Sequence, residues 1–291
     1  MKYIDRTGTI QGNDDIQDRF LKGLYSNVVG RFIISLLVHP CVSKVGGWLL
    51  STKWSSKVVP SFCKSNHIDL SLYNKQEFDS YNDFFTRKIL EDKKEIDYNP
   101  THLVSPCYSK LSVYPITKNM SFKVKNTRYT LSRLLRSKKL ASKYEGGVVC
   151  IFRLTVDDYH RYMYIDDGYQ TQERKIKGVF HTVNPVANDV YPIYKENTRA
   201  YSVLQSKNFG NVIMMEVGAL LVGKITNHHC CCNVKRGEEK GYFEYGGSSI
   251  ILIFQKDKIK MDKDIWNNSI NGMETKVCMG EKIGEKFIIN S

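Results

Sequence analysis

Two stretches of the chain place reactive side chains beside runs that are typical of buried strands. In GYFEYGGSSIILIF (241–254), residues 246–249 are Gly-Gly-Ser-Ser between an aromatic run and an aliphatic one. Taken alone, this composition indicates a tight turn between two strands. In FRLTVDDYHR (152–161), an apolar run ends in Asp157, Asp158, Tyr159, His160 and Arg161. Titratable groups crowded at a strand end indicate either a catalytic site or a satisfied polar cluster.

The elements that must position these groups change in character near residue 100. Apolar residues recur at helical spacing over 15–25 and 28–38, and YNDFFTRKIL (81–90) is typical of helix packing. Trp48 and Leu49 could face a membrane, but core packing is the expectation. Beyond Val104, branched and aromatic runs at 148–156, 212–217 and 249–254 predict strands. We therefore predict an α+β fold, with a helical front over 1–100 and a β-rich body over 101–247.

The positive charge of the chain is concentrated in one segment. The 291 residues include 43 Lys+Arg and 30 Asp+Glu, a formal charge of +13. Nine bases and no acid lie between residues 117 and 143, where Leu131, Leu134 and Leu135 have the spacing of a short helix. Such a helix could lie on an anionic bilayer, contact nucleic acid or be a solvated face.

The cysteines and apolar stretches exclude several classes of protein. Eight cysteines without a CxxC spacing, in a chain with no secretory signal, predict reduced thiols in the cytosol. The run His228–Cys232 could bind a metal, but neighbours in an extended segment point to opposite faces, so a partly buried segment is the expectation and no metal is predicted. The longest apolar stretch, 28–38, has 11 residues, fewer than the ~20 that a spanning helix needs.

In their order along the chain, these stretches resemble the phosphatidylserine decarboxylase family. The likeness includes LYSNVVGRF (24–32), NDFFTRKI (82–89), SPCYSKL (105–111), FRLTVDDYHR, VNP (183–185), NTR (197–199), VGALLVGKI (217–225) and GEEKGYFEYGGSS (237–249). Each motif is short, and their collinear order identifies the family. The chain departs from the family pattern at Tyr108, where the family has Asp, at Met163, where it has a second His, and at Val156, where it has Pro.

The resemblance implies a zymogen that cleaves itself. Ser248 would attack the carbonyl of Gly247, with His160 as general base. The products would be a β chain of residues 1–247 and an α chain of residues 248–291, whose first residue becomes a pyruvoyl group. This covalent pyruvate would be the cofactor, and no external cofactor is implied. In the family it binds the substrate amine as a Schiff base and takes up the electrons released as CO2 departs.

The implied activity is that of a lyase of phospholipid biosynthesis, which converts phosphatidylserine to phosphatidylethanolamine and CO2. The resemblance places the protein peripherally on the cytoplasmic face of the cell membrane. Arg133, Arg136, Lys138 and Lys139 would then contact anionic phospholipid rather than nucleic acid. The α and β chains of one precursor would be partners, and homodimerisation is left open. Tyr108 and Met163 also leave open a non-processing, lipid-binding family member, and a pyruvoyl decarboxylase of a soluble amino acid is a third hypothesis.

Overall fold

The computed structural model describes residues 2–12, 40–124, 127–179, 181–182, 192–219, 224–244 and 248–288. Its helices are α3 (Pro40–Leu50), α4 (Val59–Ser65), α5 (Tyr81–Phe85), α6 (Leu131–Leu135), α7 (Lys138–Ala141), α9 (Ile193–Glu196) and α10 (Lys263–Ile270). Short 3₁₀ helices are η1 (Lys53–Val58), η2 (Leu70–Leu72), η3 (Glu91–Lys93) and η4 (Ser142–Tyr144).

Strands form most of the body that follows residue 100. They are β1 (Tyr3–Ile4), β2 (Ile10–Gln11), β3 (His102–Val104), β4 (Ser109–Pro115), β5 (Ser121–Val124), β6 (Thr127–Thr130), β7 (Val148–Leu154), β8 (Arg161–Met163), β9 (Gly168–Gln170), β10 (Arg174–Ile176), β11 (Arg199–Ser206), β12 (Gly210–Val217), β13 (Lys224–Asn227), β14 (Cys232–Val234), β15 (Glu239–Glu244), β16 (Ser248–Phe254), β17 (Ile259–Met261), β18 (Glu274–Val277) and β19 (Lys282–Lys286). The predicted α+β class is confirmed.

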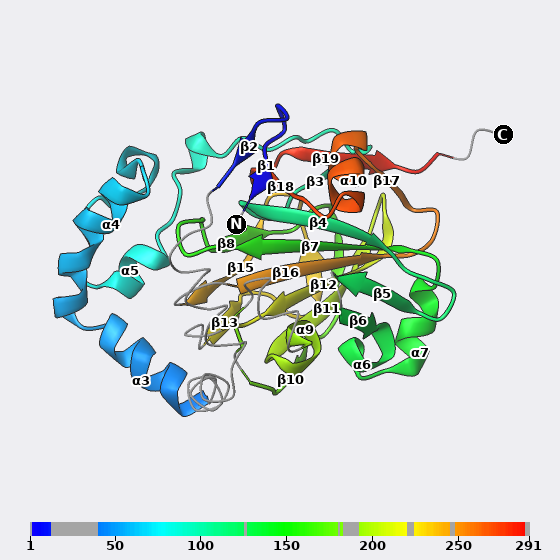
Figure 1. Ribbon diagram of the computed structural model, residues 1–291, viewed down its shortest axis with the longest axis horizontal. Helices are drawn as coiled ribbons and strands as arrows, with labels where there is room; N and C mark the ends of the chain where they lie inside the picture. The colour runs from blue at the N-terminus through cyan, green and yellow to red at the C-terminus, as the bar shows by residue number, and fades with distance from the viewer. Residues whose placement is uncertain are drawn as a thin grey trace.

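One large sheet organises the described residues. Its strand order is β14-β9-β11-β12-β16-β7-β4-β18-β1-β2, with β10 also paired to β11. Smaller sheets have the orders β13-β15-β8 and β17-β19-β3, and β5 pairs with β6. The long strands β4, β7 and β16 run across the middle of the molecule (Figure 1). All seven residues of β16 are buried, so its unbroken apolar run fits a strand covered on both faces.

The three strand runs expected from composition are confirmed as β7, β12 and β16. The expected helix around Leu131, Leu134 and Leu135 is also confirmed as α6, and all three leucines are buried. The helical spans expected at 15–25 and 28–38 lie outside the described residues. Residues 2–12 add a hairpin of β1 and β2 that was not expected. β1 also pairs in parallel with β18.

One expectation about the front of the chain was wrong, and the turn expected at the glycine pair stays a prediction. Trp48 is 68% exposed and Leu49 is 53% exposed, so they do not pack in the core. The tight turn expected at 246–249 lies partly outside the described residues, and the strands on either side of it are in different sheets, β15 in the β13-β15-β8 sheet and β16 in the large sheet. The strands on either side of the glycine pair therefore do not form a hairpin with each other.

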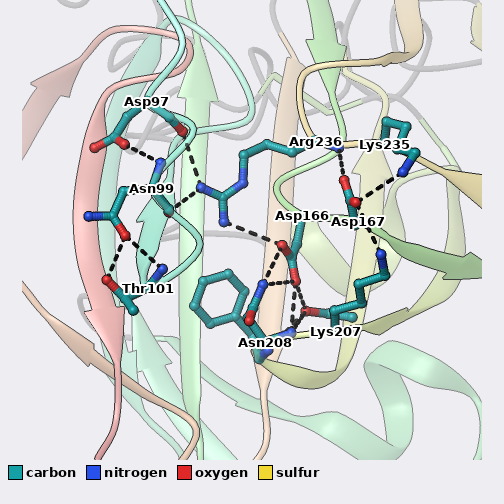
Figure 2. Close-up of polar contacts among 11 residues, drawn as sticks. Asp97, Asn99, Thr101, Asp166, Asp167, Lys207, Asn208, Lys235 and Arg236 are labelled. Atoms are coloured by element: carbon teal, nitrogen blue, oxygen red, sulfur yellow. Dashed lines mark hydrogen bonds and ion pairs between the residues drawn. The ribbon is translucent and has the colours of Figure 1, made fainter.

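A buried polar network ties four loops of the β-rich body together (Figure 2). The Arg236 guanidinium donates to the main-chain oxygens of Asp97 and Asn99, at 3.1 and 2.5 Å, and forms an ion pair of 3.3 Å with Asp166. Asp166 also accepts hydrogen bonds from Asn208. Both charged side chains are almost fully buried, at 5% exposed for Arg236 and 3% for Asp166. The network thus fixes the segment that leads into β15.

We expect Asp166→Ala to lower the free energy of unfolding by about 3–5 kcal/mol, because it leaves the Arg236 charge buried without its partner. Asp167→Asn is the matched control at the next residue. Asp167 forms ion pairs with Lys207 and Lys235, whose side chains are 65% and 73% exposed. It also accepts from the Arg236 backbone N–H at 3.1 Å, a bond that the Asn amide oxygen can keep, so its cost should be about 1 kcal/mol or less. Urea unfolding followed by circular dichroism measures both, and equal losses would contradict the assignment.

Candidate active site

His160 lies in the core between β7 and β8, as the crowded strand end had indicated. Its ring is fully buried and packs against Phe85 of α5, with 4.1 Å between the ring centroids. Phe243 of β15 contacts the other side, and its backbone N–H donates to the His160 carbonyl at 3.0 Å. The structure therefore brings three separate stretches of the sequence, around residues 85, 160 and 243, to one place.

One hydrogen bond sets the tautomer of His160. Nδ1 lies 2.9 Å from the main-chain carbonyl oxygen of Asp158. Because a carbonyl oxygen can only accept, Nδ1 must carry the proton and Nε2 must present a lone pair. Nε2 is buried and has no hydrogen-bond partner among the described residues. Burial lowers the pKa of His160 to about 3, so the ring is neutral at physiological pH.

The Asp158 carboxylate holds this arrangement through Lys110 of β4. Lys110 Nζ lies 2.8 and 2.9 Å from the two carboxylate oxygens, and it also donates to Thr155 Oγ1 at 2.6 Å. The side chains of Lys110 and Asp158 are only 4% and 9% exposed. The Thr155 backbone N–H donates to the same carboxylate at 2.7 Å. Asp158 therefore acts on His160 through its backbone, while its side chain fixes the turn.

Lys110 is a site residue that the sequence analysis missed. It lies in the SPCYSKL stretch, where a single cation occurs in a strand whose first five residues are buried. A lysine in a buried strand needs a carboxylate partner, and the Asp157-Asp158 pair was available in the adjoining motif. The pairing itself depends on the register between β4 and β7, which places Lys110 opposite Arg153.

Ser248 is the first residue of β16 and lies opposite Leu154, the last residue of β7. His160 follows Leu154 by six residues in the chain. The Ser248 hydroxyl is buried and has no hydrogen-bond partner among the described residues, and the same is true of His160 Nε2. The two atoms are therefore not hydrogen-bonded to each other. Gly247, the other residue of the expected cleavage site, lies outside the described residues.

Two buried and unpartnered polar atoms near the same strand end are costly to the fold. Each unsatisfied group typically costs about 1–3 kcal/mol, and such groups are uncommon in native proteins. A hydroxyl and an imidazole lone pair are the nucleophile and base of an acyl transfer. The arrangement can support that chemistry if the backbone of residue 247 brings its carbonyl to the hydroxyl.

Tyr108 does not replace the carboxylate that the family has at its position. Its ring packs edge-on against Tyr159, with centroids 6.1 Å apart. Burial raises the pKa of Tyr108 to about 12, so the phenol is neutral. Tyr108 does not hydrogen-bond to His160, because Nδ1 is bound to the Asp158 carbonyl and Nε2 has no partner among the described residues. Met163 is buried in β8 and cannot transfer a proton.

A buried ion pair lies on the same face of the large sheet as Ser248. Glu216 of β12 lies opposite Ile250, and Ile250 and Ser248 are two residues apart on one strand, so their side chains share a face. Lys240 Nζ lies 2.7 Å from Glu216 Oε1, and the side chains are 1% and 0% exposed. Sequence periodicity gave no signal for this pair, because Glu216 is a single charge in the apolar strand β12 and its partner lies in a strand of another sheet.

The predicted membrane-binding bases occupy the surface of α6 and α7. Arg133, Arg136, Lys138 and Lys139 are all exposed. The leucine stripe of α6 faces the core, so Leu131, Leu134 and Leu135 are not available to insert into a bilayer. Within the described residues, no helix has both the length and the apolar character needed to cross a bilayer.

A second exposed surface contains Trp48 and Leu49, for which membrane contact was the alternative to the expected core packing. We call it the α3–η1 surface and define it by Val45, Trp48, Leu49, Trp54 and Val58, each more than half exposed. Lys53 and Lys57 belong to η1, the 3₁₀ helix that also carries Trp54 and Val58. In Figure 1 these elements stand apart from the sheets, at the opposite end of the molecule from α6 and α7. Large apolar side chains gathered on one exposed surface are typical of interaction sites.

Comparisons with known proteins identify the family. Residues 81–285 match the family model for phosphatidylserine decarboxylase. The chain is 48% identical to phosphatidylserine decarboxylase proenzyme 2 of Clostridium acetobutylicum, over 91% of each chain. It is 40% identical to the Clostridium tetani proenzyme over 93% of each chain, and 37% identical to that of Fusobacterium nucleatum over 98% of each chain. The chain therefore belongs to the phosphatidylserine decarboxylase family.

Proposed function

We propose that the chain is a proenzyme that cleaves itself before Ser248 and then decarboxylates phosphatidylserine to phosphatidylethanolamine. The observation that carries the proposal is a pair of buried groups without a hydrogen-bond partner among the described residues: Ser248 Oγ, opposite the last residue of β7, and His160 Nε2, in the turn between β7 and β8. The names of the relatives, all of them proenzymes, supply the substrate and the requirement for processing. The covalent pyruvoyl group would arise from Ser248.

In the proposed self-cleavage, Ser248 Oγ forms a bond to the Gly247 carbonyl carbon while its proton passes to His160 Nε2. The proton then goes to the departing amide nitrogen, the C–N bond breaks, and an ester joins residues 247 and 248. Elimination from the ester frees residue 247 as a carboxylate, and loss of ammonia with uptake of water leaves the ketone at residue 248. His160 is suited to the first step because its tautomer leaves Nε2 unprotonated.

The residues around Ser248 fit a buried carbonyl cofactor. The Ser248 hydroxyl is buried, and among the described residues it has no hydrogen-bond partner that would compete for it. When formed, the pyruvoyl group supplies an electron sink for decarboxylation of a bound amine. The protein's own contribution is to exclude water and to present the charges of Glu216 and Lys240 on the same face of the sheet.

A second candidate function is a non-processing family member that binds lipid, and the neutral Tyr108 favours it. In an Asp-His-Ser relay the carboxylate stabilises the imidazolium that forms as the serine loses its proton. Here the tautomer is preserved by the Asp158 carbonyl, but within the part of the chain that the structure describes no carboxylate accepts from either ring nitrogen of His160. Loss of the carboxylate slows the cleavage. Because each chain is cleaved only once, a slow cleavage step can still reach completion.

We further propose that the protein acts peripherally on anionic membranes at the cytoplasmic face of the cell membrane. The α3–η1 surface offers two tryptophans and three aliphatic side chains to insert at the interface. The exposed bases of α6 and α7 supply the attraction to anionic headgroups. A lipid substrate explains both surfaces, whereas a soluble amino acid explains neither.

The intact mass of the purified protein tests the self-cleavage. We expect two chains that correspond to residues 1–247 and 248–291, with the second carrying a ketone that reacts with hydroxylamine. Ser248→Ala should abolish cleavage, and His160→Gln should slow it by at least about a hundredfold. Ser249→Ala, at the neighbouring hydroxyl, is the matched control and should still be cleaved between residues 247 and 248.

The pH dependence of the same assay reports on His160. Because its pKa is lowered to about 3, Nε2 stays unprotonated, and the cleavage rate should not fall between pH 8 and pH 5. An ordinary histidine, with a pKa near 6.5, would lose most of its free base over that range. A wild-type chain that never cleaves, with phosphatidylserine left unchanged, would instead establish the non-processing function.

Replacing Tyr108 with aspartate should accelerate self-cleavage by about tenfold or more, because a carboxylate near His160 stabilises its protonated form. Tyr108→Asn is the matched control, since it removes the same ring without adding a charge. The fraction of cleaved chain is followed by mass spectrometry from the time of synthesis. Equal rates for the Asp and Asn variants would show that charge at position 108 does not reach the histidine.

Vesicle sedimentation separates the two surfaces. We expect Trp48→Ala with Trp54→Ala to weaken binding to phosphatidylserine-containing vesicles by about tenfold or more at all salt concentrations, because buried apolar area is lost. Replacing Arg133, Arg136, Lys138 and Lys139 with glutamine should weaken binding mainly at low salt. Tyr98→Ala, at another exposed aromatic, is the control and should bind normally. Unchanged binding in both multiple variants would refute the proposed membrane contact.

A further inference from the structure

The run of three cysteines at 230–232 has no part in the chemistry above, yet its first two thiols lie side by side. Cys230 Sγ is 3.5 Å from Cys231 Sγ, and both residues are exposed. In an extended chain adjacent side chains point to opposite faces, which had argued against convergence. Cys231 instead has a left-handed backbone with φ of 52°, and this reverses the alternation. The expectation of a partly buried segment was therefore wrong for these two residues.

Among the described residues, the surroundings of the pair supply too few ligands for an ordinary metal centre. His228 Nε2 is 2.7 Å from Glu239, and His229 Nε2 is 3.2 Å from Glu238, so both imidazoles are engaged in other contacts. Within the described residues, no group of three or more His, Cys, Asp or Glu side chains could hold a metal ion. Structural zinc takes four protein ligands, so the pair alone does not make a zinc site. A metal or metalloid bound here must therefore be one that needs only two sulfur donors from the protein.

The geometry also disfavours a disulfide between the two residues. Adjacent α-carbons across a trans peptide are about 3.8 Å apart, below the roughly 4.4–6.8 Å of ordinary disulfides. A single bridging atom suits the spacing better. Two bonds of about 2.3 Å to sulfur, the length of a Zn–S bond, span the 3.5 Å between the thiols when they meet at an angle of about 100°.

The angle of about 100° at the bridging atom decides which sulfur-binding metal or metalloid fits between the two thiols. Two-coordinate Cu(I) and Hg(II) place their sulfurs on opposite sides, which needs a wider separation. Trivalent arsenic forms a shallow pyramid with angles close to the one required. We propose that Cys230 and Cys231 form a surface dithiol that chelates trivalent arsenicals.

The proposed reaction balances without an oxidant. An arsenical of the form R–As=O condenses with the two thiols, so that two S–H bonds break and two As–S bonds form. The oxygen leaves as water with both thiol protons, and neither sulfur nor arsenic changes oxidation state.

Phenylarsine oxide is the probe, applied to the full-length protein kept reduced with a phosphine. We expect one phenylarsenic group per chain by intact mass, resistant to excess 2-mercaptoethanol and removed by 2,3-dimercaptopropanol. Resistance to a monothiol is the signature of a two-sulfur chelate. Cys230→Ser and Cys231→Ser should each abolish the resistant adduct, whereas Cys232→Ser and Cys278→Ser, matched controls at a half-buried and an exposed thiol, should retain it.

Three results would overturn the proposal. The first is an adduct that a monothiol displaces, and the second is an adduct that persists when both Cys230 and Cys231 are serine. The third is the absence of any adduct although both thiols are free to react. Titration of the native protein with a chromogenic disulfide shows whether Cys230 and Cys231 are reduced and accessible. Far-ultraviolet circular dichroism of each variant confirms that loss of the adduct is not loss of the fold.

Discussion

The ion pair between Lys110 and Asp158 is the interaction on which the candidate site depends. It fixes the turn between β7 and β8, and the carbonyl of that turn sets the tautomer of His160. A buried pair of this kind contributes little net stability compared with apolar residues, but loss of one partner typically costs about 3–5 kcal/mol. The pair matters because it positions the backbone. Together with three hydrogen bonds to Thr155, it holds this turn more rigidly than an exposed turn without such contacts would be held.

This arrangement separates two tasks that a carboxylate on a histidine usually performs together. Orientation of the ring is retained, because Nδ1 donates to the Asp158 carbonyl. Stabilisation of the charged ring is lost, because Tyr108 is neutral and burial strongly disfavours the imidazolium. A base with a pKa of about 3 is always available but takes up a proton reluctantly. The site is thus well organised and electrostatically weak, which is compatible with a reaction that occurs once.

The sequence predicted the parts of the structure that depend on local pattern. The apolar runs became β7, β12 and β16, and the leucine spacing became α6, because burial of an apolar stripe or strand is decided within a few residues. Ser248 and His160 were found through motif order rather than through pattern, since neither residue type has a periodic signature. Their burial without a partner needed the structure.

Other features depend on contacts that no local pattern encodes. Lys110 meets Asp158 only because β4 pairs with β7, and β1 meets β18 across most of the length of the chain. Trp48 and Leu49 have the composition of core residues, and nothing in their neighbourhood shows that they stay exposed. The convergence of Cys230 and Cys231 depends on one left-handed residue, a conformation that composition does not predict for cysteine.

The position of Ser248 in the sheet explains how the protein could survive a break in its own backbone. β16 lies between β12 and β7, and β18 lies between β4 and β1, so residues from 248 onward contribute two strands flanked on both sides by the rest of the chain. Each ladder persists whether or not residues 247 and 248 are joined, because interstrand hydrogen bonds and buried apolar area do not depend on that bond. The chain also passes there from the β13-β15-β8 sheet to the large sheet. A break between two sheets interrupts no strand pairing, and the ketone would then form at the first position of a fully buried strand, held by its neighbours on both edges.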